Sequence, residues 1–584
     1  MKLKFFAVLT VLSSASLLHA TAYNGQGVYT VGSGVTDYPT LGAFAADFTA
    51  LSTGMTGDTT VTIVSDLTET TNPLLGAPTN GSTLYIKPQA SQKPVVTFTK
   101  TTLDATAASG LAGNLVIGPR AYATALPANL TLASNFAAMK VVIDGSNTPN
   151  GTTRDLTFQN VATSPEINRF IINVSGDCDN TVIKNCKVIS NTAGATDNIG
   201  IVFWHRYTTD GAPLNLAPDN CTVSNCDINT SVSVAPASAN IVGIGVKCAR
   251  IGAAATGTAI TGLKVQNCDI SASLRCLYLN DNAGGLVDGN RLKIQQSGGG
   301  GGQVIEAVKH DGSNAVLGWT MDVTRNTFAI DSQSTRGIHG AVSMGGGMTT
   351  AISATPGTVT NIANNFVTAN CLTTSVSATT SIYHIVELEG NTLTGTFNVL
   401  HNSFDAEDWT AYTVSTADLD NLGAISTKAT ASNQFNGILN VRNNIVRIAE
   451  DRLKYFQCAN TTGTNAAYNF DNNTIYRPNQ PLVGSGIHFA ELPYNTNLND
   501  FAAWQATAHD SNSNQADPLV GAGTGKWIST SDLHFDADPG STFQSATSVG
   551  ATVDIDNQAR PNGALEKGAD EFYAVSSVKD WSIY

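Results

Sequence analysis

The sequence predicts an all-β fold, a right-handed parallel β-helix solenoid with an N-terminal capping helix. Three observations predict it: a short phrase that recurs in one register, a composition low in charge, and a helical segment ahead of the first copy. Charged residues make up 13% of the chain, against roughly 25% in ordinary globular proteins. Equivalent side chains of stacked coils lie about 4.8 Å apart, so neutral side chains stack with less repulsion than charged ones.

The recurring phrase is an apolar strand residue, two mostly polar residues, a key Asn or Cys, one further residue and usually another apolar residue. It first covers residues 183–188 and last covers residues 470–475. The key residues are Cys186, Cys226, Cys268, Asn290, Asn326, Asn365, Asn402, Asn444 and Asn473. The shortest step, from Cys268 to Asn290, fits one bare three-strand coil, and longer steps fit the same coil with inserted loops.

The key column is interpreted as structural. Asparagine tolerates the left-handed backbone conformation that a bend between strands requires, and stacked amides can hydrogen-bond along the axis. Cys186, Cys226 and Cys268 occupy equivalent positions, where a small buried side chain replaces Asn. Free packed thiols are expected there, with pairing between stacked neighbours as the alternative. A zinc site is not expected, because no His or carboxylate joins these cysteines at zinc-ligand spacing.

The N-terminus predicts export. Lys2 and Lys4 precede an apolar run over residues 5–18, and small residues follow within 19–22, which is typical of a secretory signal peptide. The run is shorter than the roughly 20 residues of a transmembrane helix. We therefore expect a secreted or cell-surface protein with no transmembrane segment.

The rest of the chain divides into four parts. Residues 23–100 are expected to form the N-terminal cap and first coils, and residues 101–500 the parallel β-helix. Residues 501–574 form a closing segment, and residues 575–584 a tail or possible sorting tag. Both ends of an open solenoid expose unpaired strand edges and a core cross-section, so both need a cover.

The expected cover at the first end is a helix. Leu41, Phe44, Phe48 and Leu51 fall on one helical face, and Thr40 is placed to cap the N-terminus. A turn at residues 57–58 then leads into the first strand.

On these residues the opening "YPTLGAFAADF … GDTTVTIVSDLTE" resembles the start of pectate-lyase-like parallel β-helix proteins exported by bacteria. The chain from Phe501 and Trp504 through Asp517 to residues 568–572 resembles their closing segment. The resemblance implies the fold and export. It does not imply one activity, because this architecture hosts lyases, hydrolases, adhesins and proteins without a known reaction.

The charge balance restricts the partners. A net charge of -14 without any Lys/Arg cluster argues against nucleic acid. The expected partner is a polysaccharide or cell-surface glycan, and the sequence leaves the oligomeric state open.

Glycoside hydrolysis needs two or three carboxylates around the scissile bond. Similarity to polygalacturonases would bring Asn-Thr-Asp, Asp-Asp and Gly-His-Gly motifs on successive coils. His339, within residues 337–340, comes nearest to the last motif, but no Asp-Asp pair precedes it.

Elimination by a pectate-lyase-like enzyme needs a base, often Lys or Arg, and usually calcium. Polar residues precede several key residues at similar intervals and could form one stripe along a groove. The catalytic candidates are His205, Lys247, Lys309, His310 and His339. The ligand-contact candidates are Trp204, Arg206, Glu387, Glu389 and Lys428. The alternative is a solvated strand face without a ligand.

Asp405, Glu407 and Asp408 form the densest acidic cluster and are candidate calcium ligands, although their spacing does not match the EF-hand loop. Two functions remain open. The first is an exported β-helix that binds glycans or acts as an adhesive or structural element, and the absence of an intact catalytic motif favours it. The alternative is a polysaccharide lyase or glycoside hydrolase acting in a groove on the β-helix.

Overall fold

A computed structural model describes most of the chain. The described residues are 22–51, 53–99, 113–118, 138–161, 169–190, 197–207, 213–231, 240–249, 260–280, 284–295, 305–311, 320–332, 337–344, 358–371, 382–388, 395–406, 423–427, 435–449, 453–458, 466–478, 488–492, 496–519, 526–545, 550–560 and 565–572. The expected signal peptide and the expected tail lie almost wholly outside them.

Within these residues, three long parallel sheets run along the molecule, and each coil adds one strand to each sheet in turn. Sheet A contains β1 (Gly27–Val31), β2 (Thr59–Ile63), β5 (Leu84–Pro88), β8 (Val141–Asp144), β11 (Val182–Lys184), β15 (Thr222–Ser224), β18 (Leu263–Gln266), β21 (Gly285–Asp288), β24 (Met321–Thr324), β27 (Val359–Ala363), β31 (Thr396–Leu400), β34 (Ile438–Arg442) and β37 (Ala467–Asp471).

Sheet B follows in each coil. It contains β3 (Leu67–Glu69), β6 (Val95–Phe98), β9 (Leu156–Asn160), β12 (Cys186–Ser190), β16 (Asp227–Asn229), β19 (Asp269–Ala272), β22 (Arg291–Gln295), β25 (Thr327–Ser332), β28 (Phe366–Cys371), β32 (Ser403–Ala406), β35 (Ile445–Ile448) and β38 (Thr474–Tyr476).

Sheet C completes the coil. Its main path contains β4 (Leu74–Leu75), β7 (Leu115–Ile117), β10 (Arg169–Ser175), β13 (Asp197–Tyr207), β17 (Asn240–Ala249), β20 (Arg275–Asn280), β23 (Ile305–Asp311), β26 (Gly337–Met344), β30 (Val386–Leu388), β33 (Gly423–Ser426), β36 (Lys454–Gln457), β39 (Ala490–Glu491) and β40 (Asn497–Leu498). Strands β14 (Pro213–Leu216) and β29 (Ile382–Tyr383) pair beside it.

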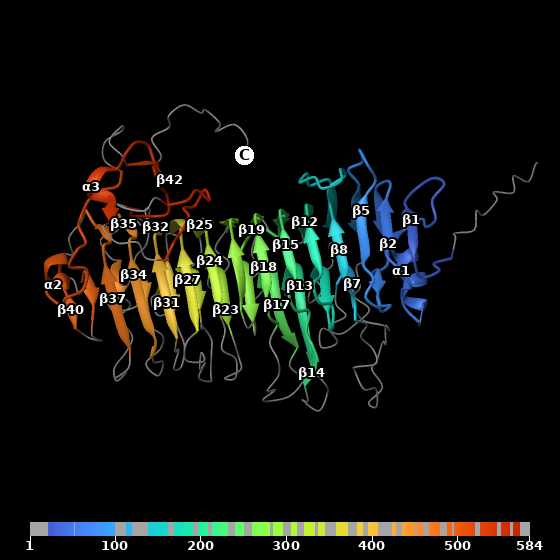
Figure 1. Cartoon of the computed structure of the whole chain (residues 1–584), viewed down its shortest axis with the longest axis horizontal. Coiled ribbons are helices and arrows are strands. Elements are labelled where there is room, and N and C mark those ends of the chain that lie inside the picture. Colours follow the sequence, from blue (N-terminus) through green and yellow to red (C-terminus); the bar gives the residue numbers. More distant parts are fainter. Residues whose placement is uncertain are drawn as a thin grey trace, which may run out of the picture.

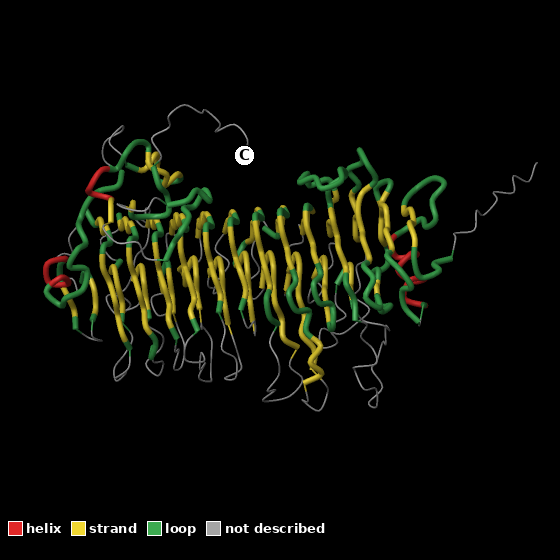
Figure 2. The backbone as a smooth tube through the Cα atoms, in the orientation of Figure 1, coloured by secondary structure: helices red, strands yellow, loops and turns green. Residues whose placement is uncertain are grey.

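The stacked strands lie side by side along the long axis, with the core between the three sheets (Figures 1 and 2). The predicted parallel β-helix fold is therefore confirmed. Among the described residues, no helix is both long and apolar enough to cross a membrane.

The predicted capping helix is present as α1 (Leu41–Ala50). Thr40 Oγ1 accepts a hydrogen bond from the Ala43 N–H at 3.1 Å, and Phe44 and Phe48 are buried. The prediction that the first strand follows the helix was wrong. Strand β1 precedes α1 and pairs in parallel with β2, because the chain enters the sheet once before it forms the helix.

The key column forms a buried amide ladder, as predicted. Asn290 Nδ2 donates to Asn326 Oδ1 at 2.9 Å, and Asn326 Nδ2 donates to Asn365 Oδ1 at 3.1 Å. Each of these amides also donates to a backbone carbonyl of the preceding coil, as Asn290 does to Val265 O at 2.9 Å. The ladder continues through Asn402 to Asn444 and Asn473.

The left-handed backbone lies one residue earlier than the sequence interpretation placed it. The residue before the key position has positive φ, for example 59° at Asn185 and 52° at His401. The key residue can therefore turn its side chain into the core, while its neighbour makes the bend.

Cys186, Cys226 and Cys268 are buried free thiols in the structure, in agreement with the expectation of free packed thiols. Their stacking is direct, since the Cys226 N–H lies 3.4 Å from Cys268 Sγ.

The closing segment covers the second end and then returns along the coils. Helix α2 (Phe501–Gln505) places Trp504 against the last coils, and Trp504 is fully buried. Strands β41 (Trp527–Ser529) and β42 (Asp532–Phe535), helix α3 (Gly540–Phe543), and strands β43 (Gln544–Ser545) and β44 (Leu565–Glu566) follow. In Figure 1, α3 and β42 lie over the region of β32 and β35. The Gly568 N–H donates to Asn443 O at 2.7 Å, which fixes the segment there.

Candidate functional site

The structure brings most predicted stripe residues into sheet C. Trp204, His205 and Arg206 lie in β13, Lys247 in β17, Lys309 and His310 in β23, His339 in β26, and Glu387 in β30. The side chains of His205, Arg206, Lys247 and His339 lie outside the described part of the structure. Glu389, Lys428, Glu407 and Asp408 also lie outside it.

Lys309 and His310 do not face one site. They are consecutive in β23, and side chains alternate between the two faces of a strand. His310 is buried and pairs in register with Leu279 and Met344, which belong to the core. Lys309 is partly exposed and contacts polar side chains on the other face. The two therefore cannot act as neighbouring catalytic groups in this arrangement.

The polar face of sheet C is organised around Glu306, which the sequence analysis did not single out. Its side chain is 0% exposed and accepts from Arg275 Nε at 2.7 Å and from Lys309 Nζ at 2.7 Å. Lys309 lies three positions after Glu306, a spacing that regular alternation places on opposite faces of a strand, so the sequence did not suggest the pair. Two cations therefore compensate the Glu306 charge directly.

Ser343 extends this network to the next coil. Its O–H donates to Glu387 Oε2 at 2.9 Å, and Glu306 Oε1 lies 3.3 Å from the same Oγ. His384 Nε2 lies 3.8 Å from Glu387 Oε1. Ser343, His384 and Glu387 are all buried. Buried charges that are paired and hydrogen-bonded are typical of a structural network, and these residues fit that role.

Trp204 is also buried. It packs edge-on against Phe170, with ring centroids 5.4 Å apart, in an apolar cluster to which Tyr278 packs. Arg275 lies over the Tyr278 ring at 5.0 Å and joins this cluster to Glu306. Trp204 is therefore not an exposed platform for a sugar ring.

Asp405, the described member of the predicted calcium cluster, is buried in β32. Its Oδ1 accepts from Arg447 Nη1 at 2.7 Å. This ion pair accounts for its charge, and the calcium site itself stays a prediction.

A second polar surface lies on the outer face of sheet A, where four asparagines stack in register on successive coils. Asn398 Nδ2 donates to Asn361 Oδ1 at 2.9 Å, and Asn440 Nδ2 donates to Asn398 Oδ1 at 2.8 Å. Asn469 extends this outer Asn ladder by donating to Asn440 at 2.9 Å. These side chains are partly or fully exposed. An amide carries two N–H donors and two acceptor lone pairs, so capacity for a ligand remains.

The outer Asn ladder forms one wall of a shallow depression of about 230 Å³, lined by Asn398, Leu400, Asn440, Arg442 and Gly550. Arg442 Nε is buried and has no hydrogen-bond partner among the described residues. The depression thus combines amides, a guanidinium group and an apolar side chain. Sequence reasoning missed it, although an Asn four residues before the key Asn recurs in four successive copies.

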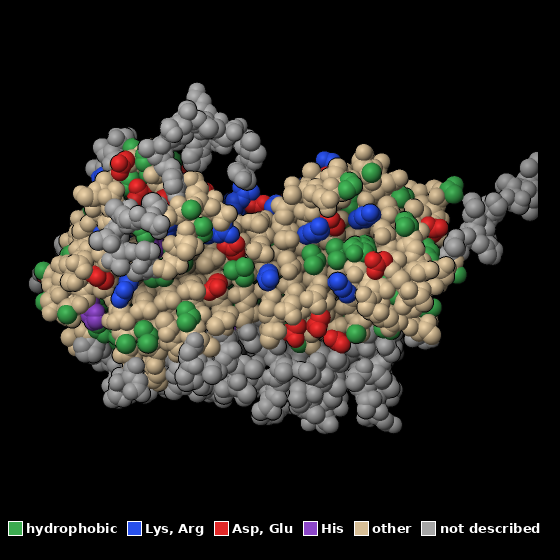
Figure 3. Space-filling model, in the orientation of Figure 1, with side chains coloured by type: hydrophobic (Ala, Val, Ile, Leu, Met, Phe, Trp, Pro, Cys, Tyr) green, Lys and Arg blue, Asp and Glu red, His purple; other side chains and the backbone are tan. Residues whose placement is uncertain are grey.

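Charged side chains are scattered over the face drawn in Figure 3, and neutral side chains and backbone predominate between them. A ligand on such a face would be held mainly by neutral hydrogen bonds and a few charges.

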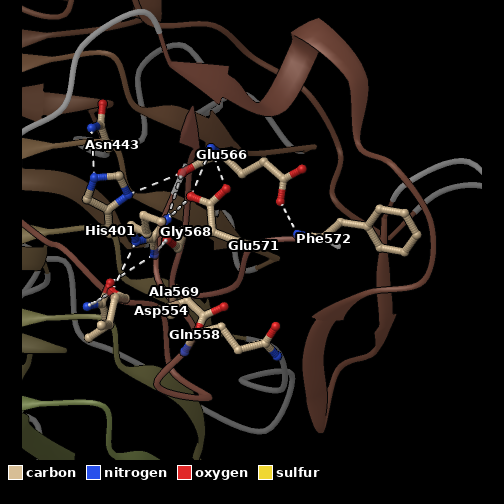
Figure 4. A network of polar contacts seen from close by, with 12 residues as sticks. His401, Asn443, Asp554, Gln558, Glu566, Gly568, Ala569, Glu571 and Phe572 are labelled. Carbon is tan, nitrogen blue, oxygen red and sulfur yellow. Dashed lines mark hydrogen bonds and ion pairs between the residues drawn. The ribbon is translucent and has the colours of Figure 1, made fainter. Parts of the chain in front are cut away.

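A buried network beneath the closing segment fixes its position, as Figure 4 shows. Asn443 Nδ2 lies 3.0 Å from His401 Nε2, and His401 Nδ1 lies 3.1 Å from Glu566 O. Because the Asn443 amide donates to Nε2, that nitrogen of the neutral ring is the acceptor. The ring proton therefore sits on Nδ1, which donates to Glu566 O. Burial, and secondarily the charge of Arg560, holds the pKa of His401 well below its usual value.

Arg560 links the closing segment to a coil 196 residues earlier in the sequence. It donates to Asn364 Oδ1 at 2.9 Å and to Gly568 O at 3.0 Å, and it forms an ion pair with Glu571. The network holds the segment that contributes Gly550 to the depression.

No family model matches the chain, and no curated protein matches it. A comparison with solved structures finds the crystal structure of pectate lyase Pel9A, with a TM-score of 0.29 and 12% sequence identity over 76% of this chain and 79% of that one. At this level of similarity the match carries no argument about activity.

Proposed function

We propose that the chain is an exported glycan-binding β-helix protein, whose binding surface is the outer Asn ladder with the depression at Arg442. The observation that carries this proposal is the open depression lined by Asn398, Asn440 and Arg442. Amide and guanidinium groups on a rigid sheet hydrogen-bond sugar hydroxyls at little entropic cost, because the ladder already orders them.

Arg442 favours an acidic glycan. Guanidinium pairs with a carboxylate through two parallel hydrogen bonds, and Arg442 lines the depression. The neighbouring amides of Asn398 and Asn440 suit the hydroxyls of the same or the next sugar. Leu400 offers an apolar contact for a ring face.

The test is retention of polysaccharides of different charge by the purified full chain, measured by affinity electrophoresis and titration calorimetry. Uronate-containing glycans should bind better than neutral ones, and added salt should weaken this preference. Arg442→Ala should weaken acidic-glycan binding about 10- to 100-fold, the range expected when one charge-assisted hydrogen-bonded pair is lost.

Lys264→Ala is the matched control, since Lys264 is an exposed cation on the outer face of sheet A, in β18, far along the stack from the depression. It should leave binding unchanged. Equal losses in both variants would indicate unspecific charge attraction and would contradict the proposal.

Polysaccharide cleavage is the alternative function, and the same samples test it. A lyase would produce unsaturated ends that absorb in the ultraviolet, and a hydrolase would produce new reducing ends. If products form and Lys309→Ala abolishes them without unfolding the protein, the binding proposal is replaced by catalysis at the face of sheet C.

Export rests on residues 1–22. A chain expressed with this segment should appear outside the cytoplasm with the segment removed, as N-terminal sequencing would reveal. Retention of the full-length chain in the cytoplasm would contradict export and leave the binding experiment unaffected.

A further inference from the structure

Three parts of the closing segment meet at a cluster separate from the glycan surface. Strand β42 supplies His534, the turn after Asp554 supplies Asp556, and the final described stretch supplies Asp570. The Ile555 N–H donates to Ala569 O at 2.8 Å, and the Phe535 N–H donates to Asp570 Oδ2 at 2.9 Å. These backbone contacts hold the three parts together.

The three side chains converge. One ligand atom from each of His534, Asp556 and Asp570 lies within 4.8 Å of the others, and His534 Nε2 is 3.5 Å from Asp556 Oδ2. The other ring nitrogen, Nδ1, is hydrogen-bonded to Asp532. A carboxylate on the far nitrogen orients metal-binding histidines in the same way, because it fixes the tautomer that presents Nε2. The ring also packs edge-on against Phe366, with centroids 4.6 Å apart.

A fourth carboxylate provides an independent observation. Asp554 is 0% exposed, and its Oδ1 accepts from the Gln558 N–H at 2.7 Å (Figure 4). Its Oδ2 is buried and has no hydrogen-bond partner among the described residues. A buried carboxylate oxygen without a partner costs free energy unless a cation compensates it.

Three carboxylates, those of Asp532, Asp556 and Asp570, contact or lie close to one imidazole. The nearby cation Arg560 is already paired with Glu571. A divalent ion would supply the missing positive charge.

We propose that His534, Asp556 and Asp570 bind one divalent transition-metal ion, with Asp532 positioning the imidazole. A mixed set of one imidazole and carboxylates suits Zn²⁺ or Mn²⁺, whereas Ca²⁺ prefers oxygen ligands alone. The side chains need to move closer, since Zn–N and Zn–O bonds are about 2.0–2.2 Å long. The ion would tie β42, the turn and the final stretch together, and so would fasten the closing segment.

The experiment uses the full chain without a polyhistidine tag, after dialysis against a chelator. Titration calorimetry with Zn²⁺ and with Mn²⁺ should show one site per chain for at least one of them, and that ion should raise the unfolding temperature. Asp556→Asn should lower the affinity of the chain for that ion at least about tenfold, because one proposed ligand is lost. Since Asp556 is exposed, the substitution should leave the fold intact. His534→Phe should do the same while keeping the ring contact with Phe366.

Asp538→Asn is the matched control, since Asp538 is an exposed carboxylate of the same segment outside the cluster. It should bind the ion as the wild type does. The proposal is overturned if neither ion binds, if binding survives both cluster variants, or if Ca²⁺ binds more tightly than both transition metals. In the first case a protonated His534 bridging Asp532 and Asp556 would explain the cluster without any metal.

Discussion

Asn402 accepts two hydrogen bonds from Asn365 of the preceding coil, one from its backbone N–H at 3.0 Å and one from its Nδ2 at 2.9 Å. Asn402 Nδ2 in turn donates to Ile362 O at 2.8 Å and to Asn444 Oδ1 at 3.0 Å. The amide is therefore fully used inside the core, where each unsatisfied partner costs about 1–3 kcal/mol.

Asn402→Ala should lower the free energy of unfolding by about 3–5 kcal/mol, because partners in two neighbouring coils lose their hydrogen bonds together. Urea denaturation followed by circular dichroism measures the loss of unfolding free energy. If the protein does not refold, the unfolding rates of the two variants are compared instead. Asn398→Ala, in the exposed ladder, is the control and should cost at most about 1 kcal/mol. Equal losses of unfolding free energy in the two variants would mean that burial does not make the inner ladder more important for stability than the exposed one.

The key column could be predicted because every coil repeats the same local demand at Asn365, Asn402 and Asn444. The contact between Arg560 and Asn364 could not, since it joins residues 196 positions apart without a shared local pattern. The sequence predicted a polar stripe that includes Lys309 and Glu387, and its role in ligand contact stays a prediction. Alternation explains why Lys309 faces outward, but periodicity alone did not reveal that Glu306 neutralises it.

The three stacked thiols should be unreactive in the folded protein. Burial raises the pKa of Cys186 and Cys268 well above its usual value, and the thiolate is the reactive form. Cys226, which contacts both of these thiols, is 0% exposed and so lies out of reach of the reagent. Iodoacetamide should leave Cys186, Cys226 and Cys268 unmodified under native conditions and label them after denaturation without reductant, as peptide mass spectrometry would reveal. Labelling that needs a reductant even after denaturation would instead indicate a disulfide.

Glu306→Leu should destabilise the fold by about 3–5 kcal/mol, because it leaves Arg275 and Lys309 without their shared buried partner. Denaturation in urea measures this loss. Lys184→Met, which removes a surface ion pair with Asp144 at 3.0 Å, is the comparison and should cost less than about 1 kcal/mol. If the network is structural, folded Glu306→Leu protein should still retain glycans; loss of retention without loss of stability would place the ligand at sheet C.

Glu566 should make stability depend on pH. Burial, together with the charges of Glu571 and Asp570, raises its pKa to about 8, although the Phe572 N–H donates to it. The folded state thus holds a proton that the unfolded chain releases near its ordinary pKa of about 4.3. The stabilising effect of that proton is complete below this value and is lost as the pH rises to about 8, with a slope of at most about 1.4 kcal/mol per pH unit.

Glu566→Gln should remove this contribution, so the free energy of unfolding measured from pH 5 to pH 8 should decline less steeply than that of the wild type. Parallel curves for Glu566→Gln and the wild type would show that Glu566 does not titrate in this range.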